Sequence, residues 1–294
     1  MSYPVHIRKI ADQYWKGRAS VFTILDLAHD EIIYAKMLHS DIEYVCLFEG
    51  RLAAELEHLA PYLIRLHKNN PFTEWLFDNG GGKNWGIFIQ SPADMNTLIR
   101  HFRRFVRVYD EEGTPMMFRF YDPRVFRVYL PTCNKSEREY VFGPVERYYA
   151  EGRNGEIIVY ASDEGRQIMR GEKKESALII RREQMEAFER DSLRQFEEEI
   201  TDFVRYRFPE VQDKPETALR VAVHEQVAKA RSYGLETGRQ VITYVTVAWL
   251  MGHKFDTDFP DIGKFLKSYR YSPDNKAERL VRWTEQMLGS QKEE

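Results

Sequence analysis

The stretch that decides the fold runs from Met116 to Pro131 and reads MMFRFYDPRVFRVYLP. Its first part, Met116–Tyr121, carries aromatic residues on both sides of Arg119, as a strand would. Asp122-Pro123 is typical of a helix start, with aspartate as the N-cap and proline at the first helical position. The stretch therefore predicts a strand that runs straight into a helix.

Charged side chains gather at this junction among large apolar residues, so they need partners. The partners are either one another, in an internal Arg–Asp network that fixes the turn, or a molecule that binds there. The candidate site residues at the junction are Arg119, Tyr121, Asp122, Arg124 and Arg127.

Length and composition indicate a soluble protein of two domains. The chain has 294 residues, of which 43% are hydrophobic and 14% aromatic, enough for a sizeable core. Its net charge of -3 is small and evenly spread, which argues against a general binder of nucleic acid or of membrane surfaces.

The compartment indicated by the sequence is the cytoplasm. The two cysteines, Cys46 and Cys133, show no CxxC spacing, which fits a reducing environment. The N-terminus lacks the features of a signal peptide, and no apolar run approaches the ~20 residues of a membrane helix.

Residues 1–165 alternate between strand-like and helix-like runs, which predicts an α/β domain with a mixed sheet and flanking helices. The expected strands are 21–27, 44–48, 61–66, 85–89, 106–109, 116–121 and 156–161. The expected helices are 30–38, 51–58, 71–78 and a segment that Ser91-Pro92 caps and that ends at Phe105.

The second predicted domain, 176–294, is small and entirely helical. We interpret the charged segment Asp163–Ser176, which contains glycines, as the linker between the two domains. Periodic apolar residues and caps predict helices at 184–208, 214–233 and 238–251, and a last one that opens at Ser272-Pro273.

The sequence contains no convincing motif for binding a cofactor or a metal. Gly80-Gly81-Gly82-Lys83 invites a phosphate-loop interpretation, but Asn84 follows where such a loop has serine or threonine, so the triplet is interpreted as a helix stop. The scattered histidines support no metal site, and Cys46 in an apolar strand is a poor nucleophile. We expect no cofactor and no metal.

Two alternative functions stay open. Asp26 and Asp122, both near predicted strand ends, are a candidate carboxylate pair for a hydrolase-like enzyme, although nothing in the sequence shows that they meet. The basic and aromatic segment Arg100–Arg107 is a candidate site for single-stranded nucleic acid. A buried aromatic stripe with arginines on the outer face explains the same pattern.

An ordered series of motifs between about residues 20 and 150 resembles a known family. The resemblance is to the adaptor (chaperone) proteins of the bacterial type VI secretion system, the Tap or Tec family. The motifs are FTILD (22–26), LFEG (47–50), APYL (60–63), WGIF (85–88), HFRR (101–104), FRFYDPR (118–124) and FGP (142–144).

The resemblance implies a non-enzymatic function in the cytoplasm. Such adaptors bind an effector toxin and help to load it onto the VgrG spike, so the implied partners are those two proteins, without nucleic acid or membrane. The helical domain would be the variable, cargo-specific part. As a hypothesis, the surface near Arg119–Arg127 binds one partner and the helical domain binds the other. The sequence does not indicate the oligomeric state or the activity of the effector.

Overall fold

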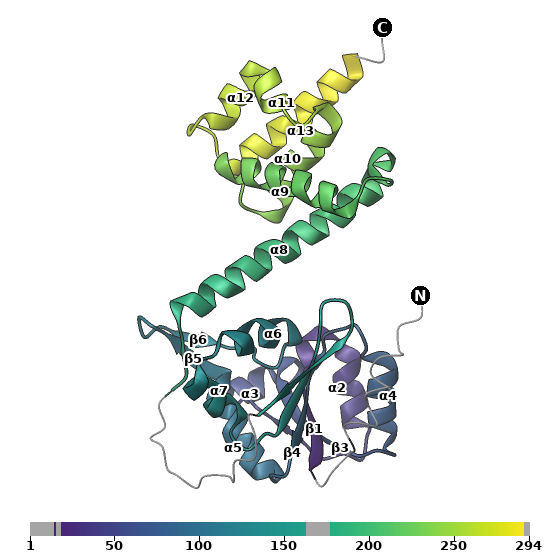
Figure 1. Ribbon diagram of the computed structural model, residues 1–294, viewed down its shortest axis with the longest axis vertical. Helices are drawn as coiled ribbons and strands as arrows, with labels where there is room; N and C mark the ends of the chain where they lie inside the picture. Colours follow the sequence, from purple (N-terminus) through teal and green to yellow (C-terminus); the bar gives the residue numbers. More distant parts are fainter. Residues whose placement is uncertain (1–14, 16–18, 163–176, 291–294) are drawn as a thin grey trace. The chain divides into compact units, whose positions relative to one another are not determined.

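The computed structural model describes residue 15 and residues 19–162 and 177–290 (Figure 1). It divides into two compact units, Met1–Glu189 and Arg190–Glu294. The first unit holds a sheet with flanking helices and the second is helical, so the predicted fold class is confirmed. The predicted linker, Asp163–Ser176, lies outside the described residues.

The main sheet of the first unit has six strands in the order β2-β3-β1-β4-β7-β8. Each neighbouring pair in it is antiparallel. The strands are β1 Ser20–Asp26, β2 Tyr44–Cys46, β3 Pro61–Leu66, β4 Gly86–Ser91, β7 Arg147–Glu151 and β8 Ile157–Ala161.

A second, small sheet has the order β6-β5-β9. In it β5 (Arg107–Asp110) pairs antiparallel with β6 (Pro115–Met117) and parallel with β9 (Ile179–Ile180). The mixed pairing expected of the domain is thus confined to this small sheet. The buried Leu178 and Ile180 belong to the core of the first unit, although the sequence placed residues from 176 onward with the helical domain.

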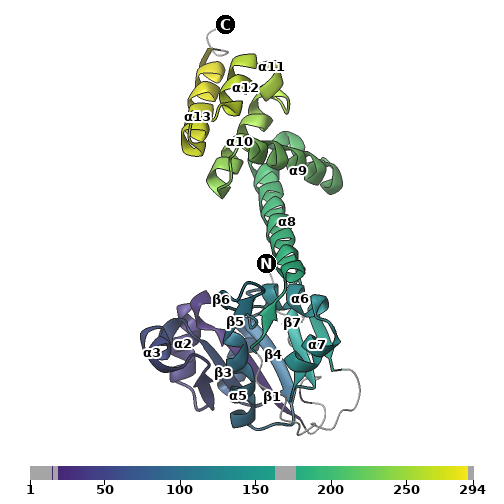
Figure 2. The same ribbon diagram turned by 90° about the vertical axis from the view of Figure 1, so that its left-hand side faces the viewer.

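Helices cover both faces of the main sheet (Figures 1 and 2). Tyr34 of α2 packs against Tyr62, and Phe77 of α4 packs against Phe88. On the opposite face, α6 and α7 both contact Tyr148. The helices of this unit are α2 Glu31–Leu38, α3 Gly50–Glu55, α4 Pro71–Asn79, α5 Met95–Val106, α6 Pro123–Thr132 and α7 Lys135–Phe142, with short 3-10 turns η1 Leu27–His29 and η2 Glu57–Leu59.

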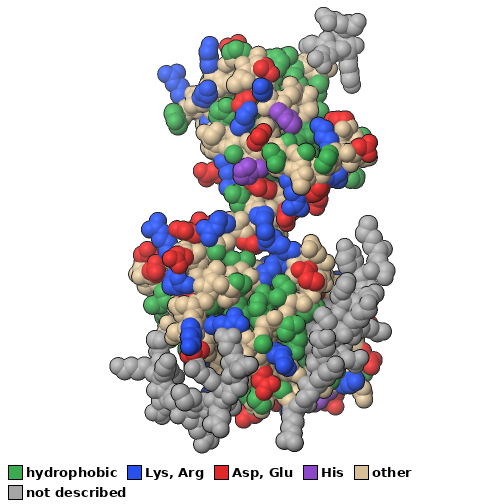
Figure 3. Space-filling model, viewed as in Figure 1, with side chains coloured by type: hydrophobic (Ala, Val, Ile, Leu, Met, Phe, Trp, Pro, Cys, Tyr) green, Lys and Arg blue, Asp and Glu red, His purple; other side chains and the backbone are tan. Residues whose placement is uncertain are grey.

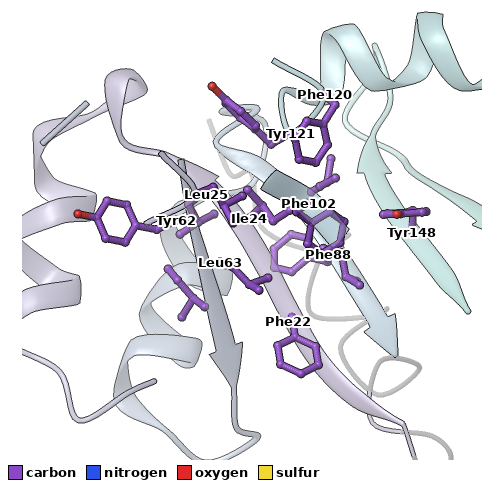
Figure 4. Packing of buried hydrophobic residues seen from close by; sticks show 14 of the residues in the cluster. Phe22, Ile24, Leu25, Tyr62, Leu63, Phe88, Phe102, Phe120, Tyr121 and Tyr148 are labelled. Carbon is purple, nitrogen blue, oxygen red and sulfur yellow. The ribbon is translucent and has the colours of Figure 1, made fainter. Parts of the chain in front are cut away.

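The segment Met116–Pro131 departs from its prediction in one respect. The strand ends at Met117 instead of Tyr121, because the chain turns toward α6 there: the Phe118 amide still donates to the Val106 carbonyl, and the Asp122 amide then donates to the Arg119 carbonyl. Phe118, Phe120 and Tyr121 are buried within this turning segment. They form the aromatic core beneath α6, where Phe120 stacks on Phe102 at 5.8 Å between ring centroids (Figure 4).

The helix start after the junction is confirmed. Asp122 is the N-cap of α6, and its side chain accepts a hydrogen bond from the Arg124 amide. In contrast, α5 begins at Met95 with Asp94 as its cap. The predicted cap, Ser91, instead ends β4, and its hydroxyl donates to the Pro144 carbonyl.

The second unit contains the predicted helices and two that the sequence did not indicate. Thr237 caps α10, as predicted, and the structure adds Gln240 as its partner in a capping box. The short helices α11 and α12 were not predicted. The helices are α8 Arg182–Arg207, which begins in the first unit, α9 Glu216–Ser232, α10 Gly238–Met251, α11 Phe255–Asp258, α12 Pro260–Lys267 and α13 Pro273–Ser290, with the 3-10 turn η3 Pro209–Val211.

Candidate functional site

Three elements meet at the end of β1. Asp26, the last residue of β1, caps the 3-10 turn η1 by accepting a hydrogen bond from the Ala28 amide at 3.1 Å. Asp122 caps α6 in the same way, and its own amide donates to the Arg119 carbonyl, which closes the turn between β6 and α6. Both aspartates therefore occupy cap positions that fix the direction of their carboxylates.

Five side chains form what we term the junction cluster: Asp26, His29, Arg119, Asp122 and Arg124. Arg119 donates to Asp26 through Nε at 3.0 Å and also through Nη2. Arg124 donates to Asp122 through Nη2 at 2.7 Å and through Nε at 3.0 Å. His29 Nε2 lies 3.6 Å from Asp122 Oδ2 and 4.0 Å from Asp26 Oδ2, so it stands between the two carboxylates.

The carboxylates of the cluster are buried and the guanidinium groups reach the surface. The side chains of Asp26 and Asp122 are 2% and 4% exposed, whereas those of Arg119 and Arg124 are 45% and 37% exposed. Burial alone would raise the pKa of Asp122, but the nearby His29 and the hydrogen bonds from Arg124 hold that pKa well below its usual range. Two carboxylates thus face two guanidinium groups, and the exposed sides of the arginines remain accessible to a bound carboxylate or carbonyl.

The structure brings together three of the five predicted site residues, Arg119, Asp122 and Arg124. Tyr121 is buried with its ring against Phe120, and burial raises the pKa of its phenol. Arg127 faces another part of the sheet, where its Nη1 donates to the Glu151 carbonyl at 3.4 Å. The junction cluster therefore keeps three of the predicted residues, and Asp26 at the end of β1 and His29 in η1 complete it.

The turn that contains Gly80-Gly81-Gly82 binds the carboxylate of Glu151. The Gly82 and Asn84 amides donate to the two carboxylate oxygens of Glu151 at 2.7 and 2.6 Å. Glu151 is 4% exposed, and burial raises its pKa despite these hydrogen bonds. Gly82 and Asn84 adopt positive φ angles of 77° and 52°, which the turn requires. The predicted helix stop is confirmed, and the amides a phosphate would need already have an acceptor.

The basic segment Arg100–Arg107 forms a buried aromatic stripe with arginines on the outer face of α5. Phe102 and Phe105 are 0% and 2% exposed, so neither ring is available to stack on a base. Arg103 donates to Glu49 and to the Cys46 carbonyl, and the Arg104 guanidinium lies 4.7 Å from the centre of the Tyr140 ring. Nothing in these contacts resembles a platform for single strands.

The remaining reactive side chains in the described residues do not form a site. Burial lowers the pKa of His101 to about 3, and the Val141 carbonyl lies 2.9 Å from its Nε2. Burial raises the pKa of both thiols, and raises that of Cys133 to about 12. Among the described residues no group of three or more His, Cys, Asp or Glu side chains is arranged to hold a metal ion, and no helix there has the length and apolar character to cross a membrane.

One comparison with known proteins finds a family in the first unit. Residues 21–140 match the model of the family described as a domain of unknown function (DUF4123). This family is associated with adaptors of the type VI secretion system. No curated protein and no solved structure matches the chain. The matched region covers β1 to most of α7 and includes the entire junction cluster.

Proposed function

We propose that this protein is a non-enzymatic adaptor that binds a type VI secretion effector in the cytoplasm of the producing cell and helps to load it onto the VgrG spike. The observation that carries the proposal is the match of residues 21–140 to a family associated with such adaptors. The FRFYDPR motif at 118–124, part of the resemblance to such adaptors, forms the turn that holds the junction cluster.

The geometry of the junction cluster favours binding over catalysis. A carboxylate pair that works as acid and base needs one member to carry a proton near neutral pH. Here the pKa of Asp122 is depressed, and each carboxylate accepts hydrogen bonds from a guanidinium group. The pair is suited to hold the end of β1 against the start of α6, while the exposed arginine faces can contact a partner protein.

Two compact units suit a protein that must contact two others. One unit would bind the effector and the other the spike, and joining two binding modules in one chain raises the effective concentration of the second partner. This arrangement requires no cofactor and no nucleic acid.

Secretion of the effector tests the proposal. In cells that lack this protein, we expect the cognate effector to remain inside while the spike is still exported, and re-expression of the full chain should restore delivery. Continued effector export without the protein would contradict the proposal. Turnover of a substrate by the purified chain that disappears in Asp122→Asn, with the fold intact, would favour the enzymatic alternative.

A further inference from the structure

The strand β8 forms one edge of the main sheet. The strand order ends at β8, and within the described residues only β7 pairs with it. An edge strand offers a row of backbone donors and acceptors to any extended chain that approaches it. Which of its groups point outward follows from the ladder that joins it to β7.

Backbone hydrogen bonds at the two ends of the ladder set its alternation. Gly152 donates to the Glu156 carbonyl at 2.7 Å, and Ser162 donates to the Glu146 carbonyl at 3.0 Å. In an antiparallel pair every second residue bonds to its neighbour, so Ile158 and Tyr160 face β7. The backbone N–H and C=O groups of Ile157, Val159 and Ala161 therefore point away from the sheet.

The other sheet edges in the described residues are short, whereas β8 is longer and its outward groups at Ile157 and Val159 pair with no other strand there. Strands β2 and β6 have three residues each, and β6 begins with Pro115, whereas β9 has two residues. Strand β8 has five residues, IIVYA, with no proline, no charged side chain and no residue of positive φ. Soluble proteins commonly shorten such an edge or place a lysine or proline on it, so the open edge of β8 points to a partner.

The side chains around β8 indicate what that partner carries. Val159 is 45% exposed, so an apolar side chain beside it would cover apolar surface. At the other end, Arg138 donates to the outward Ala161 carbonyl at 2.9 Å, and the exposed Arg147 is the register partner of Ala161. Arg138 belongs to α7 on one face of the sheet, and Arg147, whose Nη1 also donates to Gln90, shares the opposite face with Ala161, so each face carries an arginine at this end.

We propose that β8 is a docking strand onto which an extended segment of a partner protein adds as a further strand of the sheet. The segment carries an apolar residue beside Val159 and an acidic residue beside Ala161. Its main chain supplies the hydrogen bonds, as in other cases of strand addition. The proposal rests on the adaptor function, because the segment belongs to the effector or to the spike. In the space-filling view, hydrophobic side chains gather on the front of the first unit (Figure 3).

Two substitutions at Val159 block the edge without disturbing the ladder. Val159→Pro removes an outward N–H, and the hydrogen bonds to β7 come from its neighbours, so the strand itself should survive. Val159→Lys places a charge where an added strand would pack, and it covers the case in which the proline variant misfolds. Ile32→Lys on α2 is a matched control, since Ile32 is also 45% exposed and lies in the same unit.

The test measures co-purification of the tagged full chain with the effector and spike proteins encoded beside it, together with hydrogen exchange. We expect both Val159 variants to lose on the order of tenfold or more in partner affinity, while Ile32→Lys binds as wild type does. The Ile157 and Val159 amides should exchange rapidly in the free protein and become protected in the complex, with the bonded Ile158 amide as reference.

If the wild-type chain retains its partner, three results would overturn the proposal that β8 is a docking strand. The first is equal retention by all variants. The second is slow exchange of the Val159 amide in the free monomer, which would mean that this chain's own residues cover the edge. The third is a free dimer that Val159→Pro converts to monomer, which would assign the edge to a second copy. If wild type retains neither partner, the adaptor function fails as well.

Discussion

Arg119 binds Asp26, a residue 93 positions earlier in the chain, through two donors of one guanidinium group. Asp26 ends β1, and Arg119 lies in the turn that leads from β6 into α6. The contact therefore ties the central strand of the sheet to the helix that the junction motif starts.

Loss of the Arg119 side chain should destabilise the protein more than its exposure suggests. Arg119→Met leaves the buried Asp26 carboxylate without its guanidinium, which typically costs about 3 kcal/mol of unfolding free energy. Urea denaturation at neutral pH measures this loss. Arg51→Met is the control, because Arg51 pairs with Glu55 on the surface and should change stability little. Equal stability of Arg119→Met and wild type would show that the contact does not support the fold.

The Arg124 side chain separates the two interpretations of the junction. We expect Arg124→Ala to remain folded, since Asp122 keeps its contacts with His29 and with the Arg124 amide, and to retain less partner in co-purification. Circular dichroism and the retained amount of partner measure the two effects on one preparation. A variant that unfolds would assign Arg124 to the fold alone, and a folded variant with full retention would remove the junction from the binding surface.

The Glu151 carboxylate should be indispensable to the turn that contains the glycine triplet. In the wild type the Glu151 carboxylate accepts hydrogen bonds from the Gly82 and Asn84 amides. Glu151→Gln places an amide NH₂ against one of these two N–H groups, so that hydrogen bond is lost. We expect the unfolding free energy to fall by about 2 kcal/mol. Thermal and urea denaturation test this. Glu156→Gln, an exposed glutamate in the adjoining turn, is the control and should be milder. Similar losses in the two variants would contradict the account of the turn.

His101 makes stability depend on pH in the acid range. Its pKa is lowered to about 3 in the folded chain, against about 6.5 when it is exposed after unfolding. The unfolded state thus binds an extra proton between these values, and the unfolding free energy contributed by His101 falls as pH drops, by about 1.4 kcal/mol per pH unit at most. His101→Gln should show a shallower decline than wild type in urea titrations from pH 6.5 downward. Parallel pH profiles would refute this role.

The sequence identified the local signals of the fold well. Asp122-Pro123 did start α6, Thr237 did cap α10, and the glycines after α4 did end it, because each of these depends on neighbouring residues alone. The strand predicted for 116–121 was too long, because the chain turns between the Arg119 carbonyl and the Asp122 amide, and the aromatic residues there do not mark that turn.

Contacts between residues that lie far apart in the chain could not be predicted from the sequence. The sequence marked Asp26 and Asp122 as candidates, but their meeting through Arg119 depends on the strand order of the sheet. Nothing in the sequence marked Glu151 as the acceptor for the glycine turn, because strand β7 itself was not predicted. The open edge of β8 likewise becomes visible only once the strand order is known.

The most direct test of the adaptor function is purification of the tagged full chain from cells that also express the neighbouring effector and spike genes, followed by mass spectrometry. If the protein is an adaptor, the effector, the spike protein or both are recovered in stoichiometric amounts. Recovery of the chain without either protein at native concentrations would contradict this function.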